Sequence, residues 1–220
     1  EMTSSLVGSE MCIRDSRYLG YGRNEADVQV MQSIQFAIEK LQQAAQPRWL
    51  YQIFPLQLES ENQINFSCFK AHSKNLGKNL KGCERVILFA ATLGIQVDLL
   101  IERYVKLQIS QGVIMQAAAA AMIEQFCDEC QEELRQKMES EGWYLRPRFS
   151  PGYGDFSLNH QTEIISVLQC PKKIGLTLTD SLLMAPAKSV TAVIGLSRIK
   201  QPCHRHGCEV CEKKDCVFRR

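Results

Sequence analysis

The stretch Val86-Ile87-Leu88-Phe89-Ala90-Ala91-Thr92-Leu93-Gly94 decides the fold of this 220-residue chain. Its first six residues, Val86 to Ala91, are all apolar. A strand with one face in water would alternate apolar and polar side chains, so this run predicts a strand that is covered on both faces. Thr92-Leu93-Gly94 is expected to turn the chain into a helix that continues to about Val105.

The residues before this strand predict one helix and two further strands. Asn24 is a suitable N-cap, and the helix that it begins must stop before Pro47. Residues 50–54 and 64–69 have the β-branched, aromatic and alternating patterns of strands. The helix is amphipathic, because its apolar residues recur at three- and four-residue spacing. They are Val28, Met31, Ile34, Ile38, Leu41 and Ala45.

A long helix is predicted from about Gln111 to Met138. Its alanine run, residues 117–121, permits close packing, and an apolar stripe continues beyond it. Cys127 and Cys130 form a C-x-x-C spacing on this stripe, which is typical of core packing more often than of a redox or metal site. The acidic Glu124 lies beside the stripe, where such a residue is usually solvated.

The last third of the chain predicts a short helix and a β-hairpin. The helix covers residues 163–168 and ends before Pro171. Residues 174–181 and 188–196 alternate and flank a turn at Met184-Ala185-Pro186-Ala187, so we expect them to pair. The order of elements has no regular βαβ alternation. It predicts an α+β fold, a largely antiparallel twisted sheet with long packed helices.

Composition narrows the class of protein. The chain is 45% hydrophobic and 23% charged, as in soluble globular proteins, and its formal net charge is only +2. Basic and acidic residues are interspersed, so we expect no nucleic-acid partner. No apolar run has the length of a membrane span, so we expect no membrane partner and a cytoplasmic protein.

Three segments are expected along the chain. Residues 1–16 resemble the in-frame translation of a transposase sequencing adapter, so we expect them to be a disordered artefact and the natural chain to begin near Arg17. Residues 17–200 are expected to form one folded domain, and residues 201–220 a metal-binding tail. Without Cys12, nine of the 10 cysteines remain, an odd number that favours reduced thiols and metal ligation over disulfides.

The loop Arg148-Phe149-Ser150-Pro151-Gly152-Tyr153-Gly154-Asp155 is the candidate ligand site. Arginine binds carboxylates through paired hydrogen bonds, glycine permits close contact with the main chain, and a tyrosine ring can cover a flat ligand. These properties suit a small zwitterionic ligand that carries a ring. The local sequence alone favours an ordinary Pro-Gly turn over a ligand site.

The tail contains a cluster of four cysteines, with the spacing C-x4-C-x2-C-x4-C. Four thiolates this close together predict a metal site, either a structural zinc or a 4Fe-4S cluster that could admit an electron. Nearby lysines and arginines would offset the thiolate charges. The predicted ligands are Cys203, Cys208, Cys211 and Cys216, with His204 and His206 as alternatives.

Several of these segments occur together, and in this order they resemble the activation domain of cobalamin-dependent methionine synthase. The resemblance covers about residues 18–196 and is closest to the small stand-alone form found in anaerobic bacteria. The segments are residues 86–94, the alanine-rich helix with Glu124, the Arg148-x-x-x-Gly152-Tyr153 loop, and residues 174–181 followed by Pro186 and Ser189-Val190. One flank differs, since Gly154-Asp155-Phe156-Ser157 replaces the family's Pro-Ala-Cys-Pro.

The resemblance implies that the chain binds S-adenosylmethionine. By this correspondence Arg148 would hold the carboxylate of the ligand, and main-chain groups of Ser150 and Gly152 would contact its polar atoms. Tyr153 would lie near the transferred methyl group. Glu124 would neutralise the ammonium or sulfonium charge. Such a methyl transfer needs alignment and electrostatics, and it requires no protein nucleophile.

The resemblance also implies partners. A family member acts on cob(II)alamin, and this chain has no D-x-H-x-x-G cobalamin motif, so we expect cobalamin in trans on a corrinoid-binding methionine synthase or methyltransferase. The chain would thus belong to a methyltransferase system without being a complete methionine synthase. A reductase or a flavodoxin- or ferredoxin-type protein is the expected electron donor. The competing hypotheses are a non-catalytic, metal-stabilised scaffold and an electron-transfer partner of a corrinoid protein.

Overall fold

The computed structural model describes residues 28–59 and 62–200, and these form two compact units. The first unit contains the described residues up to Ala45 together with Gln96–Gln125. The second contains Gln46–Ile95 and the residues from Phe126 onward. The long helix α5, Ile109–Ser140, runs through both units, so each unit is described separately.

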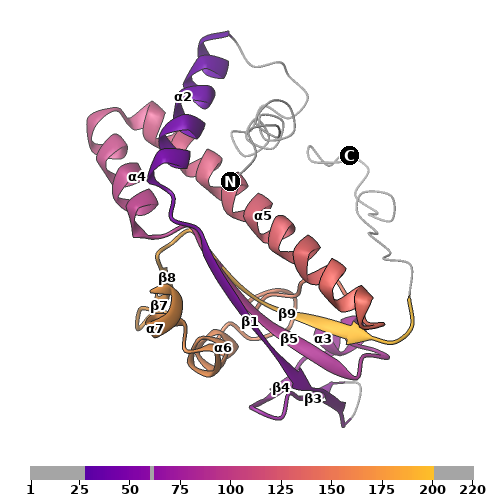
Figure 1. Ribbon diagram of the computed structural model, residues 1–220. Helices are drawn as coiled ribbons and strands as arrows, with labels where there is room; N and C mark the ends of the chain where they lie inside the picture. The colour runs from indigo at the N-terminus through magenta and orange to yellow at the C-terminus, as the bar shows by residue number, and fades with distance from the viewer. Residues whose placement is uncertain (1–27, 60–61, 201–220) are drawn as a thin grey trace, which may run out of the picture. The chain divides into compact units, whose positions relative to one another are not determined.

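The second unit is built on a four-stranded antiparallel sheet (Figure 1). Its strand order is β1-β5-β9-β6, so β5 and β9 are the two central strands. All three strand pairs are antiparallel, as the sequence predicted. The bounds are Arg48–Pro55 for β1, Arg85–Thr92 for β5, Tyr144–Leu145 for β6 and Ser189–Ser197 for β9.

The apolar run of residues 86–91 forms a strand because both of its faces are covered. Every residue of β5 after Arg85 is buried. Val86, Leu88 and Ala90 pack into the hydrophobic core, whereas Ile87 and Phe89, on the opposite face of the strand, are also completely buried. The prediction of a doubly covered strand is therefore confirmed.

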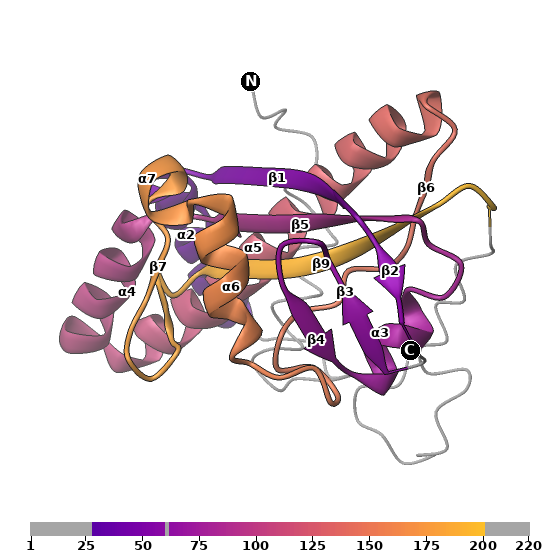
Figure 2. The ribbon, with the colours of Figure 1, turned by 90° about the horizontal axis from the view of Figure 1, so that it is seen from below.

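Helices from later in the chain cover this sheet (Figure 2). Helix α6, His160–Leu168, packs on the face that carries Leu88, and Ile164, Ile165 and Leu168 are buried there. Helix α7, Cys170–Ile174, follows directly and adds Cys170 and Ile174 to the same core. The part of α5 within this unit, residues 126–140, lies on the opposite face in Figure 2.

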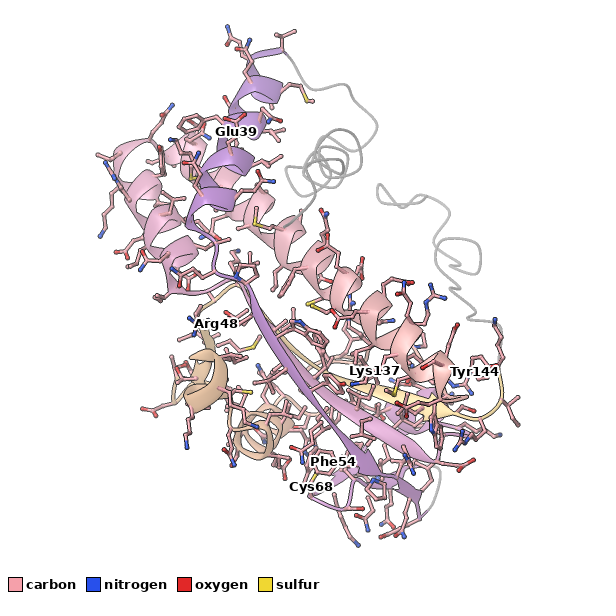
Figure 3. All side chains as sticks on the ribbon, in the orientation of Figure 1. Glu39, Arg48, Phe54, Cys68, Lys137 and Tyr144 are labelled. Carbon is pink, nitrogen blue, oxygen red and sulfur yellow. The ribbon has the colours of Figure 1, made fainter. Side chains whose placement is uncertain are left out.

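A small second sheet with its own helix lies beside this core. Strands β2 (Gln57–Leu58), β3 (Gln63–Asn65) and β4 (Lys70–His72) pair in that order, all antiparallel. Helix α3, Lys74–Asn79, follows β4 and begins at the N-cap Ser73. Phe54 of β1 and Cys68 of the turn between β3 and β4 are labelled in Figure 3.

The expected single strand at residues 64–69 is wrong, because the chain makes a tight turn there. Ser67 has a positive φ of 65°, and its N–H donates to Oδ1 of Asn65 at 2.9 Å. An asparagine side chain that accepts from the main chain two residues later stabilises a turn. The segment therefore folds back on itself as β3 and β4.

The predicted pairing of residues 174–181 with residues 188–196 is also wrong. Strand β7, Thr177–Leu178, pairs instead with β8, Met184–Ala185, across a short turn. The Thr179 hydroxyl accepts the N–H of Leu183 at 3.1 Å, which closes this turn before residue 188 is reached. Strand β9 is buried along almost its whole length and pairs with β5 in the main sheet.

The first unit is helical. It contains α2 (Val28–Ala44), most of α4 (Ile95–Leu107) and the first part of α5. The predicted apolar stripe of α2 is confirmed at Ile34, Ile38 and Leu41, which are completely buried, and is wrong at Val28 and Met31, which are exposed. Phe36 meets Tyr104 of α4 edge to face, with ring centroids 6.0 Å apart. The predicted N-cap Asn24 lies outside the described residues.

None of the helices within residues 28–59 and 62–200 combines the length and the apolar character needed to cross a membrane.

Candidate functional site

Arg148 donates hydrogen bonds to side chains on the second-unit part of α5. Its Nη2 donates to Oδ1 of Asp128 at 2.8 Å, and its Nη1 donates to Oε1 of Gln131 at 3.2 Å. Asp128 and Gln131 lie three residues apart on the helix, so they present to one side. The Arg148 side chain is 16% exposed and that of Asp128 is 44% exposed. The guanidinium is thus fixed in direction while part of the pair remains reachable from solvent.

The residue after Arg148 joins the loop to the central sheet. The main chains of Phe149 and Val193 exchange two hydrogen bonds of 2.9 Å, which form an isolated antiparallel bridge on β9. Val193 is completely buried. The start of the loop is therefore attached to one of the least exposed strands of the molecule.

The loop beyond Pro151 closes on itself. The N–H of Gly152 donates to the carbonyl of Phe156 at 2.8 Å, and the N–H of Phe156 donates to the carbonyl of Tyr153 at 3.0 Å. Gly152 has a φ of 87°, a conformation that glycine adopts readily. The predicted residues Arg148, Ser150, Gly152 and Tyr153 are thereby brought together on one short, internally bonded loop.

Tyr153 lies at the outer side of this loop. It is 73% exposed, and its ring meets that of Phe149 edge to face with centroids 6.0 Å apart. Ser150 is half-buried, and Gly152 is exposed. An exposed aromatic ring beside an exposed glycine offers both a flat face and an approachable main chain.

Glu124 is half-buried on α5 and belongs to the first unit, whereas Arg148 belongs to the second. Asp128 is an acidic residue of the second unit that pairs with Arg148. Sequence reasoning missed Asp128, although it lies one turn after Glu124, because 20 residues separate it from its arginine. Only the folding of α5 against the strand region brings these two charges together.

Asp155 is a second residue that the sequence did not single out. Its carboxylate accepts three hydrogen bonds at the start of α3, from Oγ of Ser73 at 2.6 Å, the N–H of Lys74 at 2.7 Å and the N–H of Asn75 at 3.0 Å. The Ser73 hydroxyl, followed by the two N–H groups, lowers the pKa of Asp155. The carboxylate is therefore ionised at neutral pH and complements the helix N-terminus.

An aromatic stack lies next to this carboxylate. Phe156 is buried, and its ring stacks on His160 with centroids 5.0 Å apart and planes at 16°. His160 also stacks on Phe69, at 5.7 Å, and its Nδ1 contacts a carboxylate oxygen of Glu163. The end of the loop is thus inserted among rings from α6 and the β3–β4 turn.

The C-x-x-C cysteines of α5 are core residues, as predicted. Cys127 is completely buried and Cys130 is 3% exposed. Burial, with smaller contributions from Glu133 and Glu129, raises the pKa of Cys130 to about 12. Such a thiol stays protonated at neutral pH and is a poor nucleophile.

The predicted metal ligands Cys203, Cys208, Cys211 and Cys216 lie outside the described residues. Within residues 28–59 and 62–200, no group of three or more His, Cys, Asp or Glu residues is arranged to hold a metal ion. The assignment of the tail therefore remains a prediction from its spacing.

Comparison with known proteins identifies the family. The sequence pattern described as "Vitamin B12 dependent methionine synthase, activation domain" matches residues 57–200. This is more than half of the 220 residues, and the chain belongs to that family. No curated protein sequence matches the chain.

Several solved chains match, and one of them shows the similarity in fold. It is described as "Crystal Structure of the MetH Reactivation Domain bound to AdoHcy". The match has a TM-score of 0.60 at 17% sequence identity and covers 80% of this chain and 67% of that one. At this identity the likeness establishes the mixed helix and antiparallel-sheet fold, whereas the ligand named there belongs to that protein.

Proposed function

We propose that the chain is a stand-alone reactivation module that binds S-adenosylmethionine at the loop of residues 148–153. It would use the methyl group to restore a cob(II)alamin carried by a corrinoid-binding methionine synthase or a related methyltransferase. The family membership supports the general role. The observation that carries the ligand assignment is the Arg148–Asp128 ion pair beside the loop.

The ion pair suits the amino-acid end of S-adenosylmethionine, which is a zwitterion. A guanidinium can bind its carboxylate through parallel N–H donors, and a neighbouring carboxylate can accept from its ammonium group. Arg148 and Asp128 place these opposite charges 2.8 Å apart, with part of each side chain open to solvent. Glu124, from the family resemblance, is proposed as a further acidic contact for the ligand's positive charge.

The remaining loop residues suit the rest of the ligand. Main-chain groups of Ser150 and Gly152 are proposed to contact polar atoms, and the exposed ring of Tyr153 to lie near the transferred methyl group. When bound, S-adenosylmethionine supplies an activated methyl group together with its own leaving group. These residues would bind and align it, and no side chain would have to act as a nucleophile.

Reactivation also needs one electron, which we propose a reductase or a flavodoxin- or ferredoxin-type protein supplies. The tail of residues 201–220 is proposed as a separate segment that holds zinc or a 4Fe-4S cluster through its four cysteines. Anaerobic purification followed by metal analysis and visible absorption separates these metals. A brown protein with about four irons supports a cluster and hence a route for the electron, whereas a colourless zinc protein excludes one.

Calorimetry with S-adenosylmethionine tests the ligand assignment. We expect binding by the unaltered protein and about 100-fold weaker binding by Arg148→Ala, because hydrogen bonds to charged groups contribute about 1.5–3 kcal/mol. Arg135→Ala is the matched control. Arg135 is also paired with an acid on α5, Glu132, but it is not part of the loop. Absence of binding heat at millimolar ligand in the unaltered protein would contradict the proposal.

A non-catalytic scaffold is the second candidate, and one observation favours it. Asp128 already neutralises Arg148, and an ion pair with this geometry can be purely structural. If Arg148→Ala lowers the melting temperature but the unaltered protein binds no S-adenosylmethionine, the ion pair serves the fold alone. A scaffold would still bind the corrinoid protein, which a pull-down with that partner would detect.

A further inference from the structure

The side chain of Asp155 joins the loop that carries Tyr153 to the start of α3. Asp155 is exposed, yet its two carboxylate oxygens accept three hydrogen bonds from Ser73, Lys74 and Asn75. These donors lie 80 to 82 residues earlier in the chain. The contact therefore links the loop to a different part of the fold and is not local turn geometry.

Ser73, one of the donors to Asp155, is itself fixed by other hydrogen bonds. Ser73 is completely buried, and its hydroxyl oxygen also accepts the N–H of Leu76, which makes it the N-cap of α3. Its own N–H donates to the carbonyl of Asn62. Because Ser73 cannot move without breaking these bonds, the carboxylate of Asp155 is held against a rigid site.

The loop approaches α3 closely at the neighbouring residue as well. Gly154 has a φ of 56°, and a Cβ there would lie 2.5 Å from Nδ2 of Asn75. A side chain at residue 154 would have to displace the exposed amide of Asn75, and the positive φ also favours glycine there. Gly154 and Asp155 therefore act together to bring the loop onto the helix.

Tyr153 lies between this contact and a second one. On one side, Gly152 bonds to the carbonyl of Phe156, whose ring is buried against His160. On the other side, Asp155 is bound to α3. The position of the exposed Tyr153 thus depends on hydrogen bonds within the loop, on the packing of Phe156 and on the charged contact of Asp155.

We propose that Asp155 is a positioning residue of the ligand site, which fixes Gly152 and Tyr153 by binding the loop to the N-terminus of α3. The inference rests on the proposed function, because it assigns these two residues to ligand binding. Asp155 does not touch the ligand and acts through the loop. The role of the Gly154-Asp155 pair also explains how a loop that departs from the family's proline-containing run keeps a defined shape.

The experiment follows the position of Tyr153 directly, without ligand. The protein is labelled with 3-fluorotyrosine, and Tyr153→Phe identifies the fluorine resonance of Tyr153 among the six tyrosines. We expect Asp155→Ala to shift this resonance towards the value of a free tyrosine and to narrow it, and to weaken S-adenosylmethionine binding about tenfold. Asp155→Glu keeps the carboxylate, so it should largely restore the position of the resonance and the affinity for S-adenosylmethionine.

Glu84→Gln is the matched control, because Glu84 is an exposed acid of the same unit outside the loop and should leave the resonance and the affinity unchanged. If Asp155→Ala does not fold, Asp155→Asn removes only the charge and is measured in its place. An unmoved resonance with unchanged affinity overturns the inference. If the resonance moves while the unaltered protein binds no S-adenosylmethionine, the positioning role stands and the proposed function fails.

Discussion

Strand β5 and the loop of residues 148–156 belong to the same unit but are held by different forces. Seven of the eight residues of β5 are buried, and apolar contacts cover it from both sides. The loop is largely exposed and is held by directed polar contacts at Arg148 and Asp155, with Phe156 as its one completely covered ring.

The difference separates stability from function. Apolar burial is non-directional and contributes in proportion to area, so the β5 region determines whether the chain folds. Hydrogen bonds between charged groups are directional and contribute less, so the contacts of the loop determine where its side chains point. Substitutions in the two regions should therefore change different measurements.

The largest effect is expected in the strand. Leu88→Ala should lower the free energy of unfolding by about 2–5 kcal/mol, because it removes buried methyl groups and leaves a cavity. Urea unfolding measures this change. Leu183→Ala is the control, since Leu183 is 65% exposed and the same substitution there should have little effect. Equal losses of stability at both positions would contradict the claim that burial in β5 determines whether the chain folds.

An intermediate effect is expected at the ion pair. Asp128→Asn removes the charge opposite Arg148 and should weaken S-adenosylmethionine binding about tenfold, while it changes the stability by less than about 1 kcal/mol because the pair is partly exposed. Calorimetry and urea unfolding measure the two quantities. Glu132→Gln is the control on the same helix. It removes an acid that is paired with Arg135, and it should alter neither the affinity nor the stability. A large loss of stability without a change in affinity would instead show that the Arg148–Asp128 pair serves the fold and not the ligand.

The smallest effect at neutral pH is expected at Cys130, because its contribution to stability changes only as the pH rises above 9. Burial raises the pKa of its thiol to about 12 in the folded protein, above the ordinary value of 9.0. The folded state then holds a proton that the unfolded state loses, so this contribution to stability is complete below pH 9 and disappears as the pH rises towards 12. Cys130→Ala should reduce the alkaline loss of stability in urea unfolding, and at pH 7 it should cost less than Leu88→Ala because it removes only one buried sulfur atom.

Alkylation with iodoacetamide at pH 8 provides a second measurement on the same thiol. Mass spectrometry should find Cys68, which is exposed, modified before Cys130. Cys68→Ser serves as the control and should leave the modification of Cys130 unchanged. Rapid modification of Cys130 in the folded protein would show that the second-unit part of α5 opens to solvent.

Much of the fold was predictable because it depends on runs of apolar residues. The strand at 86–91 and the buried cysteines of α5 follow from local hydrophobicity and periodicity. The errors lie at the two turns, which main-chain and side-chain hydrogen bonds close together. Asn65 turned the chain between β3 and β4, and Thr179 closed the turn before β8. The strand and turn propensities of single residues do not show which of these hydrogen bonds will form.

The candidate site was predictable only in part. Arg148, Ser150, Gly152 and Tyr153 lie together because they are neighbours in the sequence, and their chemistry is readable there. The residues that hold them, Asp128 on α5 and Ser73 before α3, are distant in the sequence and carry no recognisable motif.

The sequence by itself determined the buried strand, the helices, the family and the chemical character of the loop, because each follows from the order of neighbouring side chains. The tertiary structure alone decided that Asp128 pairs with Arg148 and that Asp155 binds at the start of α3. These contacts join segments 20 to 82 residues apart. Long-range polar contacts form only where packing of the apolar core brings their partners together, and local sequence patterns cannot specify that geometry.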